Sequence, residues 1–291
     1  MGFSRKTALV ACCGAFLSMP VQAASITLLA EVGPLGQALA TIDSTAPSQV
    51  ESSVLITGLG DGERLYSIDY RPNTGELYGL GSHGQLYTIN TSTGAATAVG
   101  SGFSTALNGG SFGFDFNPVI DKIRIVGDSN QNIVADPDTG AANIASTINV
   151  FYGSGDVNEG ADPNVVHHAY SGNVPNSTAT QLYAIDTNLD ILVTQSNNAG
   201  ELGTVGALGV DVSDIGGFDI GSDGFAFLMT GPLVPDTSTL FMIDLNTGAA
   251  IELGHLGLTV SGLAVRPVPV PGAVWLFGSA VAMLGLKRKR L

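Results

Sequence analysis

The sequence predicts an all-β fold, a five-bladed β-propeller with four strands per blade, from repeated strand motifs and from matching half-units at the two ends of the body. The first motif is an alternating apolar segment, an Asx-Thr-Gly turn and a second strand of small residues. It occurs at residues 86–96, 133–142, 182–187 and 240–250, and in a shorter form at 39–45. Alternation over about five residues indicates a strand, and Asx and Gly residues favour a tight turn.

A second motif comes before the copies of the first and supplies the opening strand of each repeat. Its core is an aspartate between apolar residues, followed by another alternating segment. It occurs at 68–72, 114–118 and 218–220, and His168-Ala169-Tyr170 holds the same place in a divergent copy. Each unit then has four short strands, and the units recur about every 50 residues, as propeller blades do.

The two ends of the body complete each other. Residues 263–267 repeat the second motif with no strands after it, whereas the N-terminal unit, about 26–57, has three strands and lacks a first. We expect both ends to build one blade, because this closes the ring and covers the sheet edges. A solenoid would not need matching half-units, and a sandwich would not repeat its turn chemistry at a fixed interval. The sequence therefore favours a propeller for the body, residues 24–267.

Residues 1–23 are predicted to be a secretory signal peptide. Arg5 and Lys6 precede a short apolar run, and the segment ends on a small-residue cleavage site at Ala23. Residues 9–12 also resemble a lipobox with Cys12 as the lipidated residue. Only about four apolar residues precede this cysteine, fewer than a signal segment needs, so the signal peptide is favoured.

Residues 268–291 are predicted to be a sorting and anchor segment with a C-terminal transmembrane-like helix. Pro269 and Pro271 precede Trp275 and an uncharged apolar stretch, and the chain closes on the basic cluster Lys287, Arg288, Lys289 and Arg290. Basic residues stay on the cytoplasmic side of a membrane, so the body would face outward. The alternative, a final core helix, would show a polar face that this stretch lacks.

This tail resembles a PEP-CTERM sorting signal in the order of its parts: Pro-rich motif, Trp-Leu-Phe, apolar helix and terminal basic cluster. It departs from that pattern in having Val-Pro-x-Pro in place of Pro-Glu-Pro. The resemblance implies an exosortase-type processing enzyme as a partner and a Gram-negative source that makes exopolysaccharide. It also implies export, anchoring in the inner membrane facing the periplasm, and later display at the cell surface or release.

The body in turn resembles an uncharacterised family of bacterial secreted proteins, a domain-of-unknown-function family. The shared motifs are Leu-Tyr-x-Ile-Asx-x-x-Thr-Gly-Ala-Ala and Phe-Asp-Phe-Asn-Pro, and the resemblance covers most of residues 27–266. It implies a propeller and brings no activity with it.

The composition of the body limits its partners. Between the two end segments lie five basic residues and 25 acidic ones, a formal charge of −20. Such a body repels nucleic acid and anionic lipid, so we expect no nucleic-acid partner. Both cysteines, Cys12 and Cys13, belong to the signal segment. The fold must therefore rely on its core and not on a disulfide.

Three aspartates hold the same place in three of the repeats and form the candidate metal site. They are Asp69, Asp115 and Asp219, and Ala169 and Ala264 take the place in the other two units. Three carboxylates that converge on a propeller axis would suit a hard cation such as calcium. The alternative, which their recurrence favours, is a scaffold role in which each aspartate accepts hydrogen bonds from the turns of its own blade.

The longest insert between repeats is a weaker candidate site. Asp156, Glu159 and Asp162 precede His167 and His168, and carboxylates near histidines can form a metal or acid–base site. Glycines and a proline make the insert a loop, where acidic residues are ordinary. Adjacent histidines on a strand face opposite ways, so at most one joins a pocket. We expect that one, a candidate ligand-binding residue, to be His168.

No catalytic motif stands out in the body. Residues 136–140 lack the EF-hand spacing, and the sequence contains no G-x-S-x-G elbow, P-loop or dinucleotide fingerprint. We therefore expect no catalytic residue and no cofactor apart from an axial calcium ion. The leading hypothesis is a non-enzymatic propeller that binds a component of the envelope or extracellular polysaccharide. The alternatives are a propeller-type hydrolase or lactonase that uses an axial cation, and a purely structural spacer.

Overall fold

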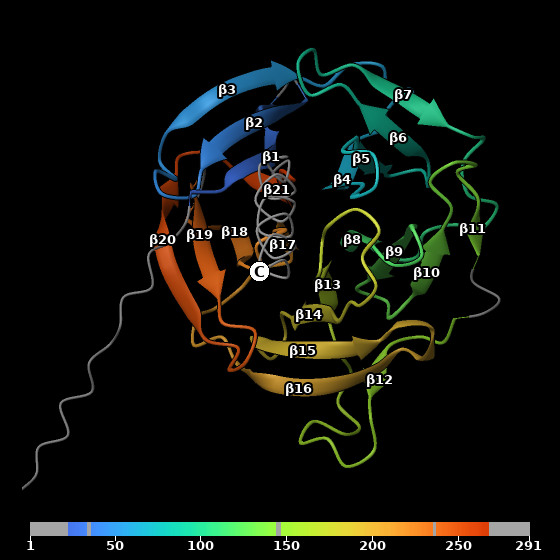
Figure 1. Ribbon diagram of the computed structural model, residues 1–291, viewed down its shortest axis with the longest axis vertical. Helices are drawn as coiled ribbons and strands as arrows, with labels where there is room; N and C mark the ends of the chain where they lie inside the picture. Colours follow the sequence, from blue (N-terminus) through green and yellow to red (C-terminus); the bar gives the residue numbers. More distant parts are fainter. Residues whose placement is uncertain (1–22, 34–35, 144–146, 235–236, 268–291) are drawn as a thin grey trace, which may run out of the picture.

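The computed structural model describes residues 23–33, 36–143, 147–234 and 237–267, which form five sheets around one axis (Figure 1). Within each sheet the neighbouring strands of the repeat are antiparallel, and the innermost strand lies beside the axis. The five-bladed β-propeller predicted from the sequence is confirmed.

The blades are numbered here in chain order, and the strands of each are given from the axis outward. Blade 1 contains β21 (Val260–Val265), β1 (Ser25–Glu31), β2 (Gln37–Asp43) and β3 (Val50–Leu55). Blade 2 contains β4 (Leu65–Tyr70), β5 (Leu77–Gly81), β6 (Leu86–Ile89) and β7 (Ala96–Val99). Blade 3 contains β8 (Phe112–Asn117), β9 (Lys122–Gly127), β10 (Asn132–Ala135) and β11 (Ala142–Asn143).

The last two blades differ from each other by one strand. Blade 4 contains β13 (Val165–Tyr170), β14 (Leu182–Asp186), β15 (Ile191–Ser196), β16 (Glu201–Ala207) and, outermost, β12 (Phe151–Tyr152). Blade 5 contains β17 (Ile215–Ile220), β18 (Ala226–Val234), β19 (Thr237–Ile243) and β20 (Ala250–Leu256). A 3-10 turn at Asn197–Ala199 connects β15 to β16.

The two ends of the body close the ring in blade 1, as the half-units predict. Strand β21 pairs antiparallel with β1, with Ile26 opposite Val265 and Leu28 opposite Leu263. In Figure 1 the red β21 lies inside the blue β1, so the last strand of the body completes the first sheet. Strand β1 therefore has no free edge with which another chain could pair.

Burial falls from the axis outward, which explains the composition of the strands. Strand β8 is buried at all six positions, because blades 2 and 4 cover both of its faces. Strand β3 on the outside of blade 1 is exposed at five of its six positions. The buried apolar side chains form five clusters among the described residues, and each cluster lies between two neighbouring blades. The blades are thus held together face to face by apolar contact.

The Thr-Gly turns do more than reverse the chain. Gly94, Gly140 and Gly248 all have positive φ, at 73°, 70° and 83°. A side chain at any of them would also collide with the backbone of a neighbouring blade, for example with Leu55 at Gly94. Glycine is therefore required both for the turn and for the close approach of adjacent blades at their outer ends.

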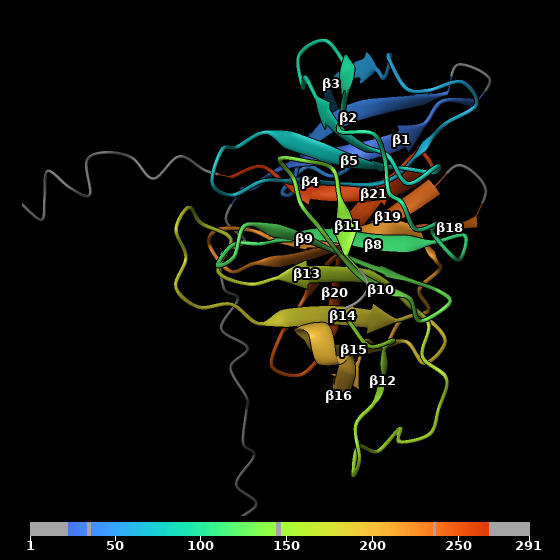
Figure 2. The same cartoon turned by 90° about the vertical axis from the view of Figure 1, so that its right-hand side faces the viewer.

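Blade 4 departs from the expected four strands. Part of the insert that precedes β13 forms β12, which pairs in parallel with β16. The insert passes along the outer edge of this blade, where the backbone groups of β16 are open to pairing. After β12 it continues as a loop that extends away from the ring in the side view (Figure 2).

The two end segments lie outside the described residues, except for Ala23. The signal peptide, the transmembrane-like helix and the sorting residues, from Pro269 to Arg290, therefore stay predictions. Within the described part of the chain, no helix has the length and apolar character needed to cross a bilayer.

Removing β21 is expected to abolish cooperative folding, because it strips blade 1 of its inner strand and exposes the buried Ile26 and Leu28. We expect a chain that ends at Gly257 to lose its cooperative thermal transition by circular dichroism. A chain that ends at Pro267 keeps β21 and serves as the control, with a body that melts as the full chain does. Equal melting of both chains would contradict closure by the termini.

Candidate axial site and channel mouth

The three repeated aspartates lie together at the axis of the propeller. Asp69, Asp115 and Asp219 occupy the same position on β4, β8 and β17, the innermost strands of blades 2, 3 and 5. Their exposed fractions are 1%, 0% and 1%. One oxygen from each carboxylate lies within 4.8 Å of the others. The structure thus brings together the residues that the sequence singled out.

Each aspartate bonds to the inner strand of the next blade. An innermost strand has a neighbour on one side only, so its other edge presents unpaired N–H groups to the axis. In each case the donor is the residue that follows the aspartate position in the next blade. The three bonds run from Phe116 N–H to Asp69 (2.8 Å), from Tyr170 N–H to Asp115 (3.0 Å) and from Val265 N–H to Asp219 (2.6 Å).

The two alanines at this position fit the same pattern. Ala169 and Ala264 offer no acceptor to the blade that follows them. In those following blades the free N–H groups of Ile220 and Tyr70 donate to the aspartate of their own strand, each over 2.6 Å. Three aspartates therefore serve five axial N–H groups.

This arrangement corrects the expected scaffold role in one respect. The donors are backbone groups of the inner strands, from the next blade or from the same strand, and not the turns of the aspartate's own blade. The reason is geometric, because only the free edges of the inner strands reach the axis. Five of the six carboxylate oxygens are used in this way. The sixth, Oδ2 of Asp115, has no hydrogen-bond partner among the described residues.

Burial raises the pKa values of all three carboxyl groups, and repulsion between the carboxylates adds to this for Asp69 and Asp115. Burial is the first cause for each, and it raises the pKa of Asp219 to about 6. Repulsion from Asp219 raises the pKa of Asp69 further, and repulsion from Asp69 and Asp219 does so for Asp115. Two unit charges about 5 Å apart repel by roughly 3 kcal/mol at an effective dielectric constant of 20. The cluster therefore favours the uptake of a proton or of another cation.

A loop closes the end of the channel beyond the aspartates. Residues 171–181 connect β13 to β14 and extend toward the centre of the ring (Figure 1). The side-chain amide of Asn173 lies 3.2 Å from the Ile220 carbonyl and 3.5 Å from Oδ1 of Asp219. The Asn176 N–H donates to Asn73 in blade 2 over 3.0 Å. The loop of blade 4 thus contacts blades 5 and 2.

The opposite end of the channel is open and forms a cavity of about 590 Å³, here called the mouth. It is lined by residues at or just before the start of each of the five inner strands, and by Glu31 at the end of β1. Five of its lining residues stand three places before the aspartate position in their blades: Tyr66, Phe112, Val166, Gly216 and Ser261. None of the three axial aspartates belongs to the lining.

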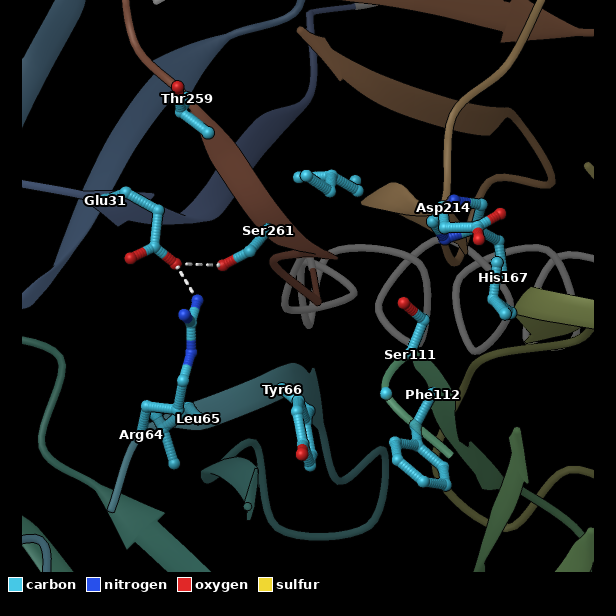
Figure 3. Close-up of a pocket in the computed structure, with 14 residues that line it drawn as sticks. Glu31, Arg64, Leu65, Tyr66, Ser111, Phe112, His167, Asp214, Thr259 and Ser261 are labelled. Atoms are coloured by element: carbon cyan, nitrogen blue, oxygen red, sulfur yellow. Dashed lines mark hydrogen bonds and ion pairs between the residues drawn. The ribbon is translucent and has the colours of Figure 1, made fainter. Parts of the chain in front are cut away.

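The mouth joins a polar cluster to an aromatic pair (Figure 3). Oε1 of Glu31 accepts hydrogen bonds from Arg64 (2.6 Å) and from Ser261 (2.9 Å). The rings of Tyr66 and Phe112 lie 5.1 Å apart at an interplanar angle of 43°. Tyr66 is half-buried and lines the cavity beside Phe112.

The structure places the two histidines in different surroundings. His168, the candidate ligand-binding residue, is 1% exposed, and its Nε2 donates to the Arg124 carbonyl over 3.0 Å. Burial lowers the pKa of His168 to about 3, which keeps the ring neutral. His167 is the one that lines the mouth, where its Nε2 donates to the Ser213 carbonyl. The adjacent histidines do face opposite ways, but the member that reaches a cavity is His167.

The carboxylates of the insert accept hydrogen bonds from their own loop and from residues on the outside of the ring. Asp156 accepts hydrogen bonds from Thr204, Glu159 from the Gly155 N–H, and Asp162 from Asn130. The axial aspartates are the one possible metal-binding group found among the described residues. The structure therefore does not bring the insert carboxylates together with the histidines.

Repeat alignment could have located the mouth in the sequence. Apart from Glu31, its lining residues stand two to five places before the aspartate position, which the repeats mark clearly. The side chains at these places differ from blade to blade, so no motif draws attention to them. The fold and the site together define the class: a five-bladed β-propeller with an acidic, backbone-bonded axis and one open mouth.

The comparison with protein families identifies the body. Residues 38–264 match the family described as Domain of unknown function (DUF4394), and this chain belongs to that family. No curated protein matches the chain in sequence.

Three solved structures illustrate the similarity of the fold. A chain of a nidogen/laminin complex matches with a TM-score of 0.48 at 10% identity, over 84% of this chain and 98% of that one. TolB from Acinetobacter baumannii matches with a TM-score of 0.43 at 15% identity, over 80% of this chain and 52% of that one. A structural genomics protein of unknown function from Bacteroides thetaiotaomicron matches with a TM-score of 0.47 at 15% identity, over 78% and 54%. This chain spans about half the length of the last two.

Replacing an axial aspartate by alanine is expected to destabilise the body, and the more so the more backbone N–H groups donate to that aspartate. Asp69→Ala leaves two buried N–H donors without an acceptor, and Asp115→Ala leaves one. Each unsatisfied donor costs about 1–3 kcal/mol. Either substitution also relieves repulsion within the cluster, so the difference between them rests on the number of N–H groups left without an acceptor. We therefore expect Asp69→Ala to lower the free energy of unfolding in urea more than Asp115→Ala does. The reverse order would contradict this account of the axis.

The axial carboxyl groups should also give the metal-free protein a specific pH dependence. A carboxyl group whose pKa is higher in the folded protein than in the unfolded chain stabilises the fold at a pH below its unfolded pKa, near 4. This stabilisation is lost as the pH rises through the pKa of the folded state. Asp115→Asn keeps an acceptor for Tyr170 and removes one charge. We therefore expect the melting temperature of the variant minus that of wild type to increase from pH 4 to pH 8, measured with a chelator present.

Buried His167 and His168 act in the opposite direction, because their lowered pKa values disfavour the folded state in acid. They are the same in both proteins, so they cancel in the difference between variant and wild type. A difference in melting temperature that stays constant from pH 4 to pH 8 would show that Asp115 does not take up a proton in this range.

Proposed function

We propose that this protein is exported and that its propeller binds a neutral extracellular polysaccharide at the mouth, without catalysing a reaction. The mouth is the observation that carries the proposal. It is open, all five blades contribute to it, and it places an aromatic pair beside a cluster of hydrogen-bonding groups. Binding sites for small polar molecules and chains combine such features.

The aromatic pair suits the apolar face of a sugar ring. Tyr66 and Phe112 come from adjacent blades and are tilted toward each other by 43°. The Tyr66 hydroxyl, Ser111 and Thr259 can exchange hydrogen bonds with sugar hydroxyl groups around the rim of the cavity. A neutral polysaccharide is favoured over an anionic one because the body carries 25 acidic residues and only five basic ones.

Export rests on the two end segments. The signal-like residues 1–23 and the tail 268–291, with its likeness to a PEP-CTERM sorting signal, support transfer across the inner membrane and recognition by an exosortase-type enzyme. The absence of cysteine from the body suits an oxidising compartment, because no thiol can form a wrong disulfide there.

The alternative function, a hydrolase or lactonase with an axial cation, has a specific difficulty. An axial cation would have to contact the substrate. The three aspartates are almost fully buried and do not line the mouth. The lining residue nearest to Asp115 on β8 is Phe112, three residues away, which is about 10 Å along an extended strand. The geometry therefore supports binding at the mouth better than catalysis at the axis.

The mouth can be tested with exopolysaccharide from the producing bacterium, separated into neutral and anionic fractions. We expect the full chain to bind the neutral fraction, and Tyr66→Ala to weaken binding about tenfold, since one stacked aromatic contributes about 1–1.5 kcal/mol. Phe151→Ala is the control, because Phe151 is 44% exposed on β12, outside the mouth.

The outcomes separate the hypotheses. Equal binding by wild type and Tyr66→Ala would exclude the mouth as the binding site. Lactone hydrolysis by the full chain, abolished by Asp115→Asn, would favour the enzyme. A chain that binds neither fraction and hydrolyses no lactone would leave the structural spacer.

A further inference from the structure

We propose that the axis of the propeller binds one hard cation of the calcium class, held by Asp69, Asp115 and Asp219. One oxygen from each carboxylate lies within 4.8 Å of the other two. Calcium contacts its oxygen ligands at about 2.3–2.6 Å, so a single ion at the centre of the group can touch all three. The three ligands come from the inner strands of three different blades.

Two buried oxygens without hydrogen-bond donors belong to residues at the cluster. Oδ2 of Asp115 is one of them. The other is Oδ1 of Asn173, a residue that is 7% exposed and belongs to the loop after β13. The side chain of Asn173 lies against Asp219, with 3.5 Å between Nδ2 and Oδ1. Native interiors leave few polar atoms without partners, and carboxylate and carboxamide oxygens are typical calcium ligands.

The negative charge of the three carboxylates also lacks a basic partner among the described residues. Among the described residues, no lysine or arginine pairs with any of the three carboxylates. Arg124 lies on β9 directly opposite Asp115, yet its guanidinium donates to Asn132 (2.7 Å) and to Asn198 (2.6 Å). A buried group of three carboxylates without a basic partner is stabilised by a bound cation.

The axial hydrogen bonds do not compete with a cation. Each backbone N–H occupies one lone pair of a carboxylate oxygen, and each such oxygen retains another for an ion. The N–H groups also hold the carboxylates in position before the ion arrives, as partners of metal ligands commonly do. Magnesium fits less well, because it requires shorter distances and near-ideal octahedral geometry.

The role of this ion would be to hold the blades together. It would join blades 2, 3 and 5 directly, and through Asn173 also the loop of blade 4 that closes this end of the channel. The site is separate from the mouth and does not depend on polysaccharide binding. A dissociation constant of about 0.1–1 mM is typical of calcium sites in extracellular proteins and would match an exported one.

The test is calcium binding by the full chain after treatment with a chelator, in about 0.15 M salt to screen weak binding to surface carboxylates. We expect one calcium ion per chain by equilibrium dialysis. We also expect the melting temperature to rise by about 5–10 °C at 100 times the dissociation constant.

Two variants and one control decide the location of the ion. Asp115→Asn keeps an acceptor for the Tyr170 N–H and should weaken calcium binding at least tenfold. Asn173→Asp adds a carboxylate and should strengthen it, which keeps the test decisive if Asp115→Asn fails to fold. Asp211→Asn changes an exposed carboxylate outside the cluster and should bind calcium as wild type does.

Three outcomes would overturn the proposal. The first is no calcium retained at 10 mM. The second is equal binding by wild type and Asp115→Asn, which would indicate adventitious binding at the surface only. The third is an Asn173→Asp variant that binds calcium no more tightly than wild type does.

Discussion

The free edges of the five inner strands set the constraint on which this structure depends. A blade pairs its innermost strand on one side only, so five strands present N–H groups to an axis where little water can reach them. Three aspartates accept all five of the hydrogen bonds from the residue after the aspartate position. Three of these bonds run from one blade to the next and thus link blades at the axis, while five apolar clusters hold the blade faces together.

The sequence could predict the ring because repetition carries topological information. A motif at residues 263–267 with nothing after it, and a first unit without an inner strand, together specify the pairing of β21 with β1. The strand β12 could not be predicted in the same way. It is two residues long, lies in an insert without a repeat, and forms only because the outer edge of β16 is free to pair.

The candidate site was predictable in its residues but not in its bonding. Alignment of the repeats marks Asp69, Asp115 and Asp219, since an axial position recurs in every blade. It does not tell which strand edge faces the axis, so the donors were expected in turns. The histidines show the same limit. Alternation predicts that His167 and His168 face opposite ways, and only the three-dimensional structure shows that His167 is the one at the mouth.

The scaffold role and the cation site at the axis are not alternatives in this structure, because the first leads to the second. Five donors served by five aspartates would bury five like charges, and the alanines at 169 and 264 avoid two of them. The three carboxylates accept all five hydrogen bonds, and one of their oxygens, Oδ2 of Asp115, still has no donor among the described residues. That oxygen, the raised pKa values and the missing basic partner are what remains after every axial N–H is satisfied. A scaffold built in this way ends with a surplus of negative charge at its centre, and a proton or a metal ion must supply the compensation.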